Sequence, residues 1–144
     1  MTGTTDDTLS TVVLRHVSFE DAGTWEELLQ PRHVDAGVDF PPGPLEADLL
    51  VVMGGPVAGG ERLAHDEDTP VQAFRSNHAL GLQFHPEVDP DTFERWLIGH
   101  HGDLQEQGVD VDVLRRATAQ EGPGLVEPSR RMVLGWLRTV GLID

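Results

Sequence analysis

The chain is predicted to adopt an α/β fold with a mostly parallel sheet, and three features of its 144 residues support this. Strand-like and helix-like segments alternate in the first half, which is the order that builds parallel sheets. One apolar run, 47–53, is typical of a strand buried on both faces of such a sheet. From about residue 89 the hydrophobic pattern is helical to the end. We therefore expect about three or four parallel strands and an antiparallel hairpin, flanked by helices.

Local signals place the elements of the first half. Thr11–Val17 is rich in β-branched residues and predicts a strand. A helix is expected next, because Thr24 and Glu27 have the spacing of a capping box, in which each side chain bonds the other's backbone N–H. A short strand is predicted at Arg32–Ala36, and the apolar run Ala47–Met53 predicts another, which ends in a Gly-Gly-Pro turn.

The second half predicts a hairpin followed by three helices. Pro70–Phe74 and Ala79–Phe84 are strand candidates whose short connection indicates a hairpin. The first helix is expected after Asp89, where a proline follows an N-cap residue. Two further helices are predicted at about 110–119 and 128–140 from their charge order and apolar spacing.

Composition excludes several classes of function. The 25 acidic residues against 10 basic ones give a formal charge of −15, which argues against binding to nucleic acid or to an anionic membrane. The chain has no cysteine, so disulfides, thiolate metal sites and cysteine nucleophiles are absent. Residues 1–10 are polar and acidic and predict a disordered tail without the features of a signal peptide, so we expect a cytoplasmic protein.

The side chains best suited to catalysis lie in the segment Gly81-Leu-Gln-Phe-His-Pro-Glu-Val88. A strand delivers His85 to its carboxyl end, Pro86 fixes a turn, and Glu87 is close enough in sequence to reach the imidazole. A carboxylate in that position orients a histidine base and stabilises its protonated form. The spacing alone also fits a structural histidine at a strand end.

A second feature is the turn Gly54-Gly55-Pro56 at the end of the apolar run. Glycines there allow a backbone N–H to point into a site and hold a developing oxyanion. A tight exit from the strand explains the same residues, and no Gly-Lys-Ser/Thr follows to form a phosphate loop.

Taken together, these segments resemble the class I glutamine amidotransferases, particularly the glutaminase part of GMP synthase. The resemblance rests on motifs in the family's order: Arg15-His-Val-Ser-Phe-Glu-Asp21, Asp48-Leu-Leu-Val-Val-Met-Gly-Gly-Pro56, Pro70-Val-Gln-Ala-Phe-Arg75 and Ala79-Leu-Gly-Leu-Gln-Phe-His-Pro-Glu-Val88. It implies a flavodoxin-like three-layer α/β/α fold that hydrolyses the side-chain amide of glutamine without a cofactor and passes ammonia to a synthetase partner. By this resemblance His85 is the general base, Glu87 orients it, and Gly54 and Gly55 contribute to the oxyanion hole.

The chain departs from the family where the nucleophile belongs. The family carries a Gly-x-Cys-x-Gly elbow, whereas between Gly60 and Pro70 this chain has only Glu61-Arg-Leu-Ala-His-Asp-Glu-Asp-Thr69. None of the serines beyond the tail, Ser18, Ser76 and Ser129, lies in a Gly-x-Ser-x-Gly turn. Residues 11–144 are therefore interpreted as one shortened amidotransferase-like domain that has lost central elements of its sheet.

Two other groups of residues have side chains that could bind a metal ion. His65-Asp-Glu-Asp68 and the pair His100 and His101 offer nitrogen and oxygen ligands, but without a spacing that puts two on one helical face, so no metal site is predicted. Three hypotheses follow: an inactive amidotransferase-like domain, a non-catalytic binding or assembly module that forms homo-oligomers through open sheet edges, and a shortened version of a longer active enzyme.

Overall fold

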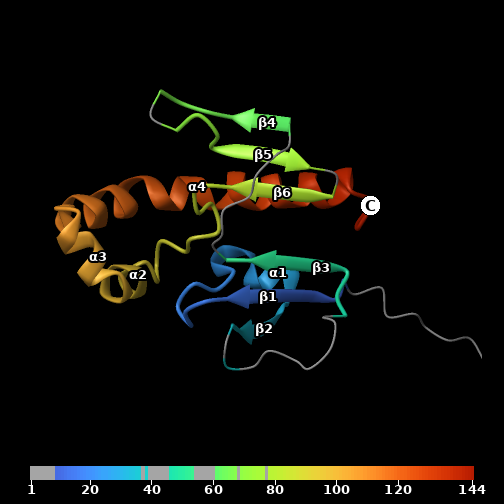
Figure 1. Cartoon of the computed structure of the whole chain (residues 1–144), viewed down its shortest axis with the longest axis horizontal. Helices are drawn as coiled ribbons and strands as arrows, with labels where there is room; N and C mark the ends of the chain where they lie inside the picture. The colour runs from blue at the N-terminus through green and yellow to red at the C-terminus, as the bar shows by residue number, and fades with distance from the viewer. Residues whose placement is uncertain (1–8, 37, 39–45, 54–60, 68, 77) are drawn as a thin grey trace, which may run out of the picture.

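A computed structural model gives the fold and describes residues 9–36, 38, 46–53, 61–67, 69–76 and 78–144. Most of the predicted tail, residues 1–10, lies outside this set. Figure 1 shows two small sheets, the long helix α4 behind them, and two short helices beyond one end of the sheets. The chain is thus an α/β protein with a three-stranded parallel sheet and a separate three-stranded antiparallel sheet.

The parallel sheet has the order β2-β1-β3, as the alternation of strand and helix predicts. Its strands are β1 (Thr11–Arg15), β2 (Arg32–Asp35) and β3 (Leu49–Val52). Val13 of the central strand faces His33 on one side and Val51 on the other. The three predicted parallel strands of the first half are therefore confirmed.

The antiparallel sheet has the order β4-β5-β6. Its strands are β4 (Glu61–Ala64), β5 (Ala73–Ser76) and β6 (Ala79–Leu82). β5 and β6 form the predicted hairpin, with Phe74 opposite Gly81. β4 was not predicted, because its four residues are all exposed and carry no alternating apolar pattern. Its pairing with β5 comes from the backbone ladder rather than from burial.

The first helical segment is confirmed, but its predicted capping box is wrong. A 3-10 turn, η1 (Gly23–Trp25), runs into the short helix α1 (Glu26–Leu29). Thr24 lies inside the 3-10 turn, so its hydroxyl is not placed to cap a helix and instead donates to the carbonyl oxygen of Glu87. The carboxylate of Glu26, rather than that of Glu27, accepts the free N–H of Ala22 at this end.

The C-terminal region contains α2 (Glu94–Gly99), α3 (His101–Glu106) and α4 (Val111–Thr139). The two helices predicted at about 110–119 and 128–140 are one continuous helix of 29 residues, so the predicted break is wrong. Pro123 and Pro128 lie within it, and each removes one helical hydrogen bond. The helix continues because Val133 and Leu137 are buried, and tertiary packing supplies most of the stability of a helix.

The core lies between the parallel sheet and two helices. Val13 of β1 packs with Leu29 of α1 and with Val133 and Leu137 of α4, and Figure 1 places α1 and α4 behind the sheets. Among the described elements, no helix lies in front of the parallel sheet in this view. Thus only one of the two helical layers expected for the sheet is present in the described part of the chain.

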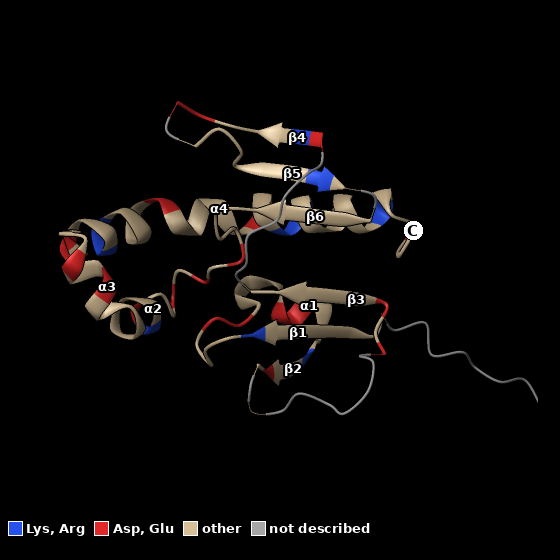
Figure 2. Ribbon diagram, in the orientation of Figure 1, with Lys and Arg blue, Asp and Glu red and all other residues tan. Residues whose placement is uncertain are grey.

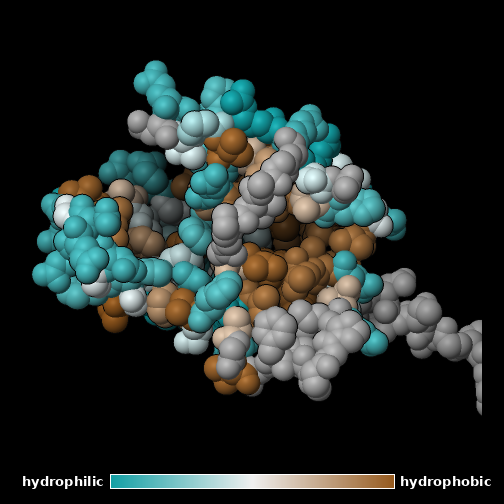
Figure 3. All heavy atoms as spheres, viewed as in Figure 1, coloured by the Kyte–Doolittle hydropathy of each residue, from teal (hydrophilic) through white to brown (hydrophobic). Residues whose placement is uncertain are grey.

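The prediction that β3 is buried on both faces is wrong for one face. Leu50 and Val52 keep 48% and 49% of their surface exposed, whereas Leu49 and Val51 pack against the core. The reason is that β3 is an outer strand, and the helices α1 and α4 cover only the face of the sheet that carries Leu49 and Val51. Figure 3 shows apolar atoms gathered over this part of the parallel sheet. We call Leu50 and Val52 the β3 patch.

The described helices were compared with the length and apolarity that a membrane span requires. Among residues 9–36, 38, 46–53, 61–67, 69–76 and 78–144, no helix is long and apolar enough to cross a membrane.

Candidate functional site

The structure brings His85 and Glu87 together just after β6. The Nδ1 atom of His85 lies 2.7 Å from Oε1 of Glu87. The Glu87 side chain is only 5% exposed, whereas that of His85 is 47% exposed. A buried carboxylate therefore holds one nitrogen of the imidazole, and the ring itself is open to solvent or to a ligand.

The same hydrogen bond changes the acidity of the histidine. The bond to Glu87 raises the pKa of His85 above its ordinary value, burial opposes this effect, and the negative charges of Glu87 and Glu20 add to the rise. The pair thus favours the imidazolium form, as expected for a histidine that is oriented by a carboxylate.

The ring of His85 also rests against α2. Its centroid lies 4.8 Å from that of Trp96, with an angle of 67° between the planes. Trp96 in turn contacts the rings of Phe19 and His100. This edge-to-face packing adds a second restraint on the orientation of the imidazole.

The backbone of Glu87 is held by the first half of the chain. Its carbonyl oxygen accepts the N–H of Thr24 at 2.8 Å and the hydroxyl of Thr24 at 3.2 Å. Gly23 makes this contact possible, because its φ is +49° and a Cβ on it would lie 2.0 Å from the Glu87 carbonyl oxygen. Only glycine combines that backbone conformation with such a close approach.

Helix α4 fixes the same turn from the other side. The buried Ser129 hydroxyl donates to the carbonyl of Pro86 and accepts the indole N–H of Trp25 at 2.8 Å. Nε of Arg130 donates to the carbonyl of Thr24 at 2.9 Å. The His85–Glu87 turn is therefore anchored at the backbone of two consecutive residues.

Sequence reasoning missed these supporting residues. It treated Thr24 as a helix cap and named Ser129 only to reject it as a nucleophile, whereas both bond to the His85–Glu87 turn. A glycine directly before Thr24 was the available signal for a close backbone approach. Ser129 carried no such signal, because its partners lie 43 and 104 positions away.

The structure does not describe the other predicted site residues. Gly54 and Gly55 lie outside the described residues. The chain has no cysteine, and the Ser129 hydroxyl is already used between Pro86 and Trp25. Within the described ranges, three or more His, Asp or Glu side chains do not converge as they would around a metal ion. The described site is thus a histidine and the buried carboxylate that is hydrogen-bonded to it.

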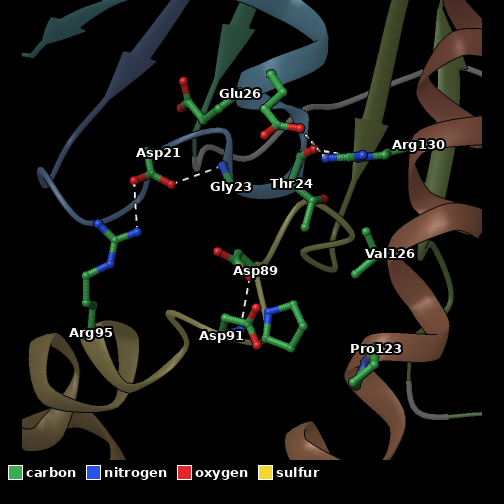
Figure 4. Close-up of a pocket in the computed structure, with 12 residues that line it drawn as sticks. Asp21, Gly23, Thr24, Glu26, Asp89, Asp91, Arg95, Pro123, Val126 and Arg130 are labelled. Atoms are coloured by element: carbon green, nitrogen blue, oxygen red, sulfur yellow. Dashed lines mark hydrogen bonds and ion pairs between the residues drawn. The ribbon is translucent and has the colours of Figure 1, made fainter.

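Two cavities flank Pro90. The larger, of about 640 Å³, does not include His85 and is shown in Figure 4. Five of its twelve lining residues are acidic, and two of these are paired with arginine: Asp21 with Arg95 at 3.1 Å and Glu27 with Arg130 at 3.3 Å. The smaller cavity, of about 360 Å³, has His85 in its wall.

Comparison with solved structures gives an informative similarity. No family model matches the chain, and neither does any curated protein. A glutamine amidotransferase from Thermotoga maritima superposes with a TM-score of 0.71, and the alignment covers 93% of this chain and 99% of that chain at 18% identity. The fold is that of a glutamine amidotransferase, which confirms at the level of structure the resemblance predicted from the sequence, in a chain without cysteine.

The contact at Gly23 predicts a strong effect of a single methyl group. Gly23→Ala is expected to lower the free energy of unfolding by more than about 1 kcal/mol, because alanine is strained at positive φ and its Cβ collides with the Glu87 carbonyl. Urea unfolding measures this. The control is Gly135→Ala in α4, where a Cβ meets nothing within 4 Å. Equal behaviour of the two variants would contradict the proposed contact.

The His85–Glu87 bond predicts a change in titration. In Glu87→Gln, the pKa of His85 is expected to fall, as followed by NMR of the imidazole protons, whereas Glu127→Gln on the exposed face of α4 leaves it unchanged. Folding raises the pKa of His85 above its ordinary value of 6.5. The hydrogen bond to Glu87 therefore stabilises the folded state fully below pH 6.5, and this stabilisation is lost as the pH rises through the pKa of the folded state. A His85 titration identical in Glu87→Gln and the parent would contradict this assignment.

Proposed function

We propose that this chain is a class I glutamine amidotransferase-like protein that does not hydrolyse glutamine. The observation that carries the proposal is a His85–Glu87 pair at hydrogen-bond distance in a chain with no cysteine. On this view the domain is a shortened flavodoxin-like three-layer fold. The similarity to a solved glutamine amidotransferase supports the fold, and the sequence motifs support the subclass.

The absence of a cysteine thiol limits the chemistry that His85 and Glu87 can perform. In the class I mechanism a thiolate attacks the amide carbonyl, and the histidine takes and returns a proton. His85 and Glu87 are hydrogen-bonded as that proton transfer requires, but the chain has no cysteine to form the covalent bond. The pair is therefore left with hydrogen bonding to a ligand as its function.

The path of the chain supports a loss of the nucleophile segment. β4 ends at Ala64 and β5 begins at Ala73, and the two strands pair directly with each other. This short connection has no space for an elbow strand and the helix that follows it. If the protein is instead a shortened version of a longer enzyme, continuous genomic sequence will encode Gly-x-Cys-x-Gly between the codons for Gly60 and Pro70.

A glutaminase assay tests the proposal. We expect ammonia release from glutamine at the rate of the protein-free blank, and the same rate for His85→Ala, because neither chain has a nucleophile. A cysteine-dependent glutaminase in the same buffer is the positive control. Turnover by the parent chain that disappears in His85→Ala would overturn the proposal and require a nucleophile other than cysteine.

A second candidate function is a non-catalytic assembly module. The observation that favours it is the β3 patch: β3 is an outer strand of its sheet, and Leu50 and Val52 are about half exposed. The β3 ribbon is tan in Figure 2, because none of its four residues is charged, although the chain as a whole is strongly acidic. Uncharged, apolar outer strands pair readily with another chain, here either a second copy or a synthetase partner.

Sedimentation equilibrium distinguishes the assembly module from a monomer. If β3 mediates self-association, the parent chain will have a mass above 15.8 kDa, and Leu50→Lys will return it to the monomer by placing a charge at the edge. Ile98→Lys is the matched control, because Ile98 is 70% exposed on α2. A parent chain that sediments only as a compact monomer would count against self-assembly.

A further inference from the structure

The C-terminal half of the chain contains a long stretch in which no residue is buried. Leu97 of α2 is 4% exposed and Ser129 of α4 is 6% exposed, but every residue from 98 to 128 is at least partly accessible to solvent. We call residues 101–121, which comprise α3 and the first part of α4, the arm. Figure 1 shows α3 and the beginning of α4 beyond one end of the two sheets. Without buried side chains, the arm depends on its two ends and on surface contacts for its position.

The arm continues into the anchored part of α4 through a weak stretch of helix. Gly122, Pro123 and Gly124 follow one another directly, and Pro128 comes four residues later. A proline inside a helix removes a backbone hydrogen bond, and glycine is among the least favourable residues there. Sharp bends in helices occur at such residues. The sequence of α4 is therefore weakest where its unburied first part meets its buried second part.

The surroundings of the two glycines define a pivot. A Cβ on Gly122 would lie 2.7 Å from the Cβ of Pro90, so the helix rests closely against the turn before α2 at this point. A Cβ on Gly124 would meet nothing within 4 Å. The helix thus has a close support at Gly122 and free space at Gly124, which is the arrangement that a hinge requires.

An ion pair ties the arm to α2. Arg115 donates from Nε to one carboxylate oxygen of Glu94 at 2.9 Å and from Nη2 to the other at 2.5 Å. Glu94 belongs to α2, which Leu97 anchors in the core. The side chains of Arg115 and Glu94 are 46% and 52% exposed. Because an exposed pair is screened by salt and contributes little free energy, it can hold the arm reversibly.

The arm also forms one wall of the smaller cavity, which is an open groove beside His85. Ala117, Thr118 and Glu121 of the arm lie across this groove from His85, Pro90 and Phe93. A rotation of the arm relative to the core changes the width of the groove, because only one of its two walls moves. We propose that the arm swings about a hinge at residues 122–124, that the Arg115–Glu94 pair holds it against the groove, and that its release widens the approach to His85.

Distances between two spin labels test the hinge. Since the chain has no cysteine, labels attach only where cysteines are introduced, here by Gln107→Cys after α3 and Arg32→Cys on β2, both at exposed positions. Double electron–electron resonance is expected to give more than one distance. Pro123→Ala combined with Gly124→Ala restores a helical N–H and removes a glycine, and is expected to leave one narrow distance. Gly135→Ala, in the anchored part of α4, is the control and is expected to match the parent.

Removal of the ion pair tests how the arm is held. Arg115→Gln is expected to enrich one of the two distances and to raise the rate at which diethyl pyrocarbonate modifies His85 by about two- to fivefold, the range by which an exposed ion pair shifts an equilibrium. Modification is followed by mass spectrometry, with the exposed His78 of the β5–β6 turn as the internal reference. Arg131→Gln is the matched control, because Arg131 pairs with Glu127 inside α4 and not with α2.

Several results would overturn the proposal. One is a single narrow distance in the parent chain that Arg115→Gln leaves unchanged. Another is the same distribution in the Pro123→Ala/Gly124→Ala and Gly135→Ala variants. A third is a His85 modification rate that responds equally to Arg115→Gln and Arg131→Gln.

The hinge rests on the proposed function only in that the site it regulates is the His85–Glu87 pair. A rigid arm in a chain that releases no ammonia from glutamine would refute the hinge alone. Ammonia release that depends on His85 would refute the proposed function, whatever the distances show.

Discussion

The carbonyl oxygen of Glu87 accepts both the N–H and the hydroxyl of Thr24, and this contact joins the two halves of the chain. Thr24 belongs to the parallel-sheet half, whereas Glu87 follows the antiparallel sheet. Gly23 permits the approach, and Ser129 of α4 holds the neighbouring carbonyl of Pro86. Because the two sheets share no strand, contacts of this kind have to supply the order that a continuous sheet would otherwise provide.

The contacts of Thr24, Gly23 and Ser129 explain how the turn that carries His85 and Glu87 is held in place. A continuous parallel sheet normally positions a histidine at a strand end, beside the strands that carry its partners. Here the buried Glu87 is fixed through its own backbone, so its carboxylate can hold His85 without a central strand nearby. The half-exposed imidazole then faces an apolar cavity closed by α4. His85 and Glu87 thus form an oriented hydrogen-bonded pair in a chain that has no cysteine.

The sequence predicted the elements defined by local patterns, and it failed where distant residues decide the outcome. β-branched runs revealed the parallel strands, and the His-Pro-Glu spacing correctly paired His85 with Glu87. β4 has no apolar pattern, so its pairing was not foreseen. The charge order and apolar spacing predicted two separate helices at about 110–119 and 128–140, but buried residues hold them in one helix, α4. Thr24 was misinterpreted because a capping spacing is local, whereas its partner lies 63 positions away.

The central claim is that the His85–Glu87 turn folds together with the parallel sheet through Thr24. Amide hydrogen exchange tests this most directly, because the Thr24 N–H is itself the donor to Glu87. We predict that this amide exchanges as slowly as that of Val13 in the central strand β1, which requires opening of the whole domain. A Thr24 amide that exchanges rapidly while Val13 remains protected would contradict the account.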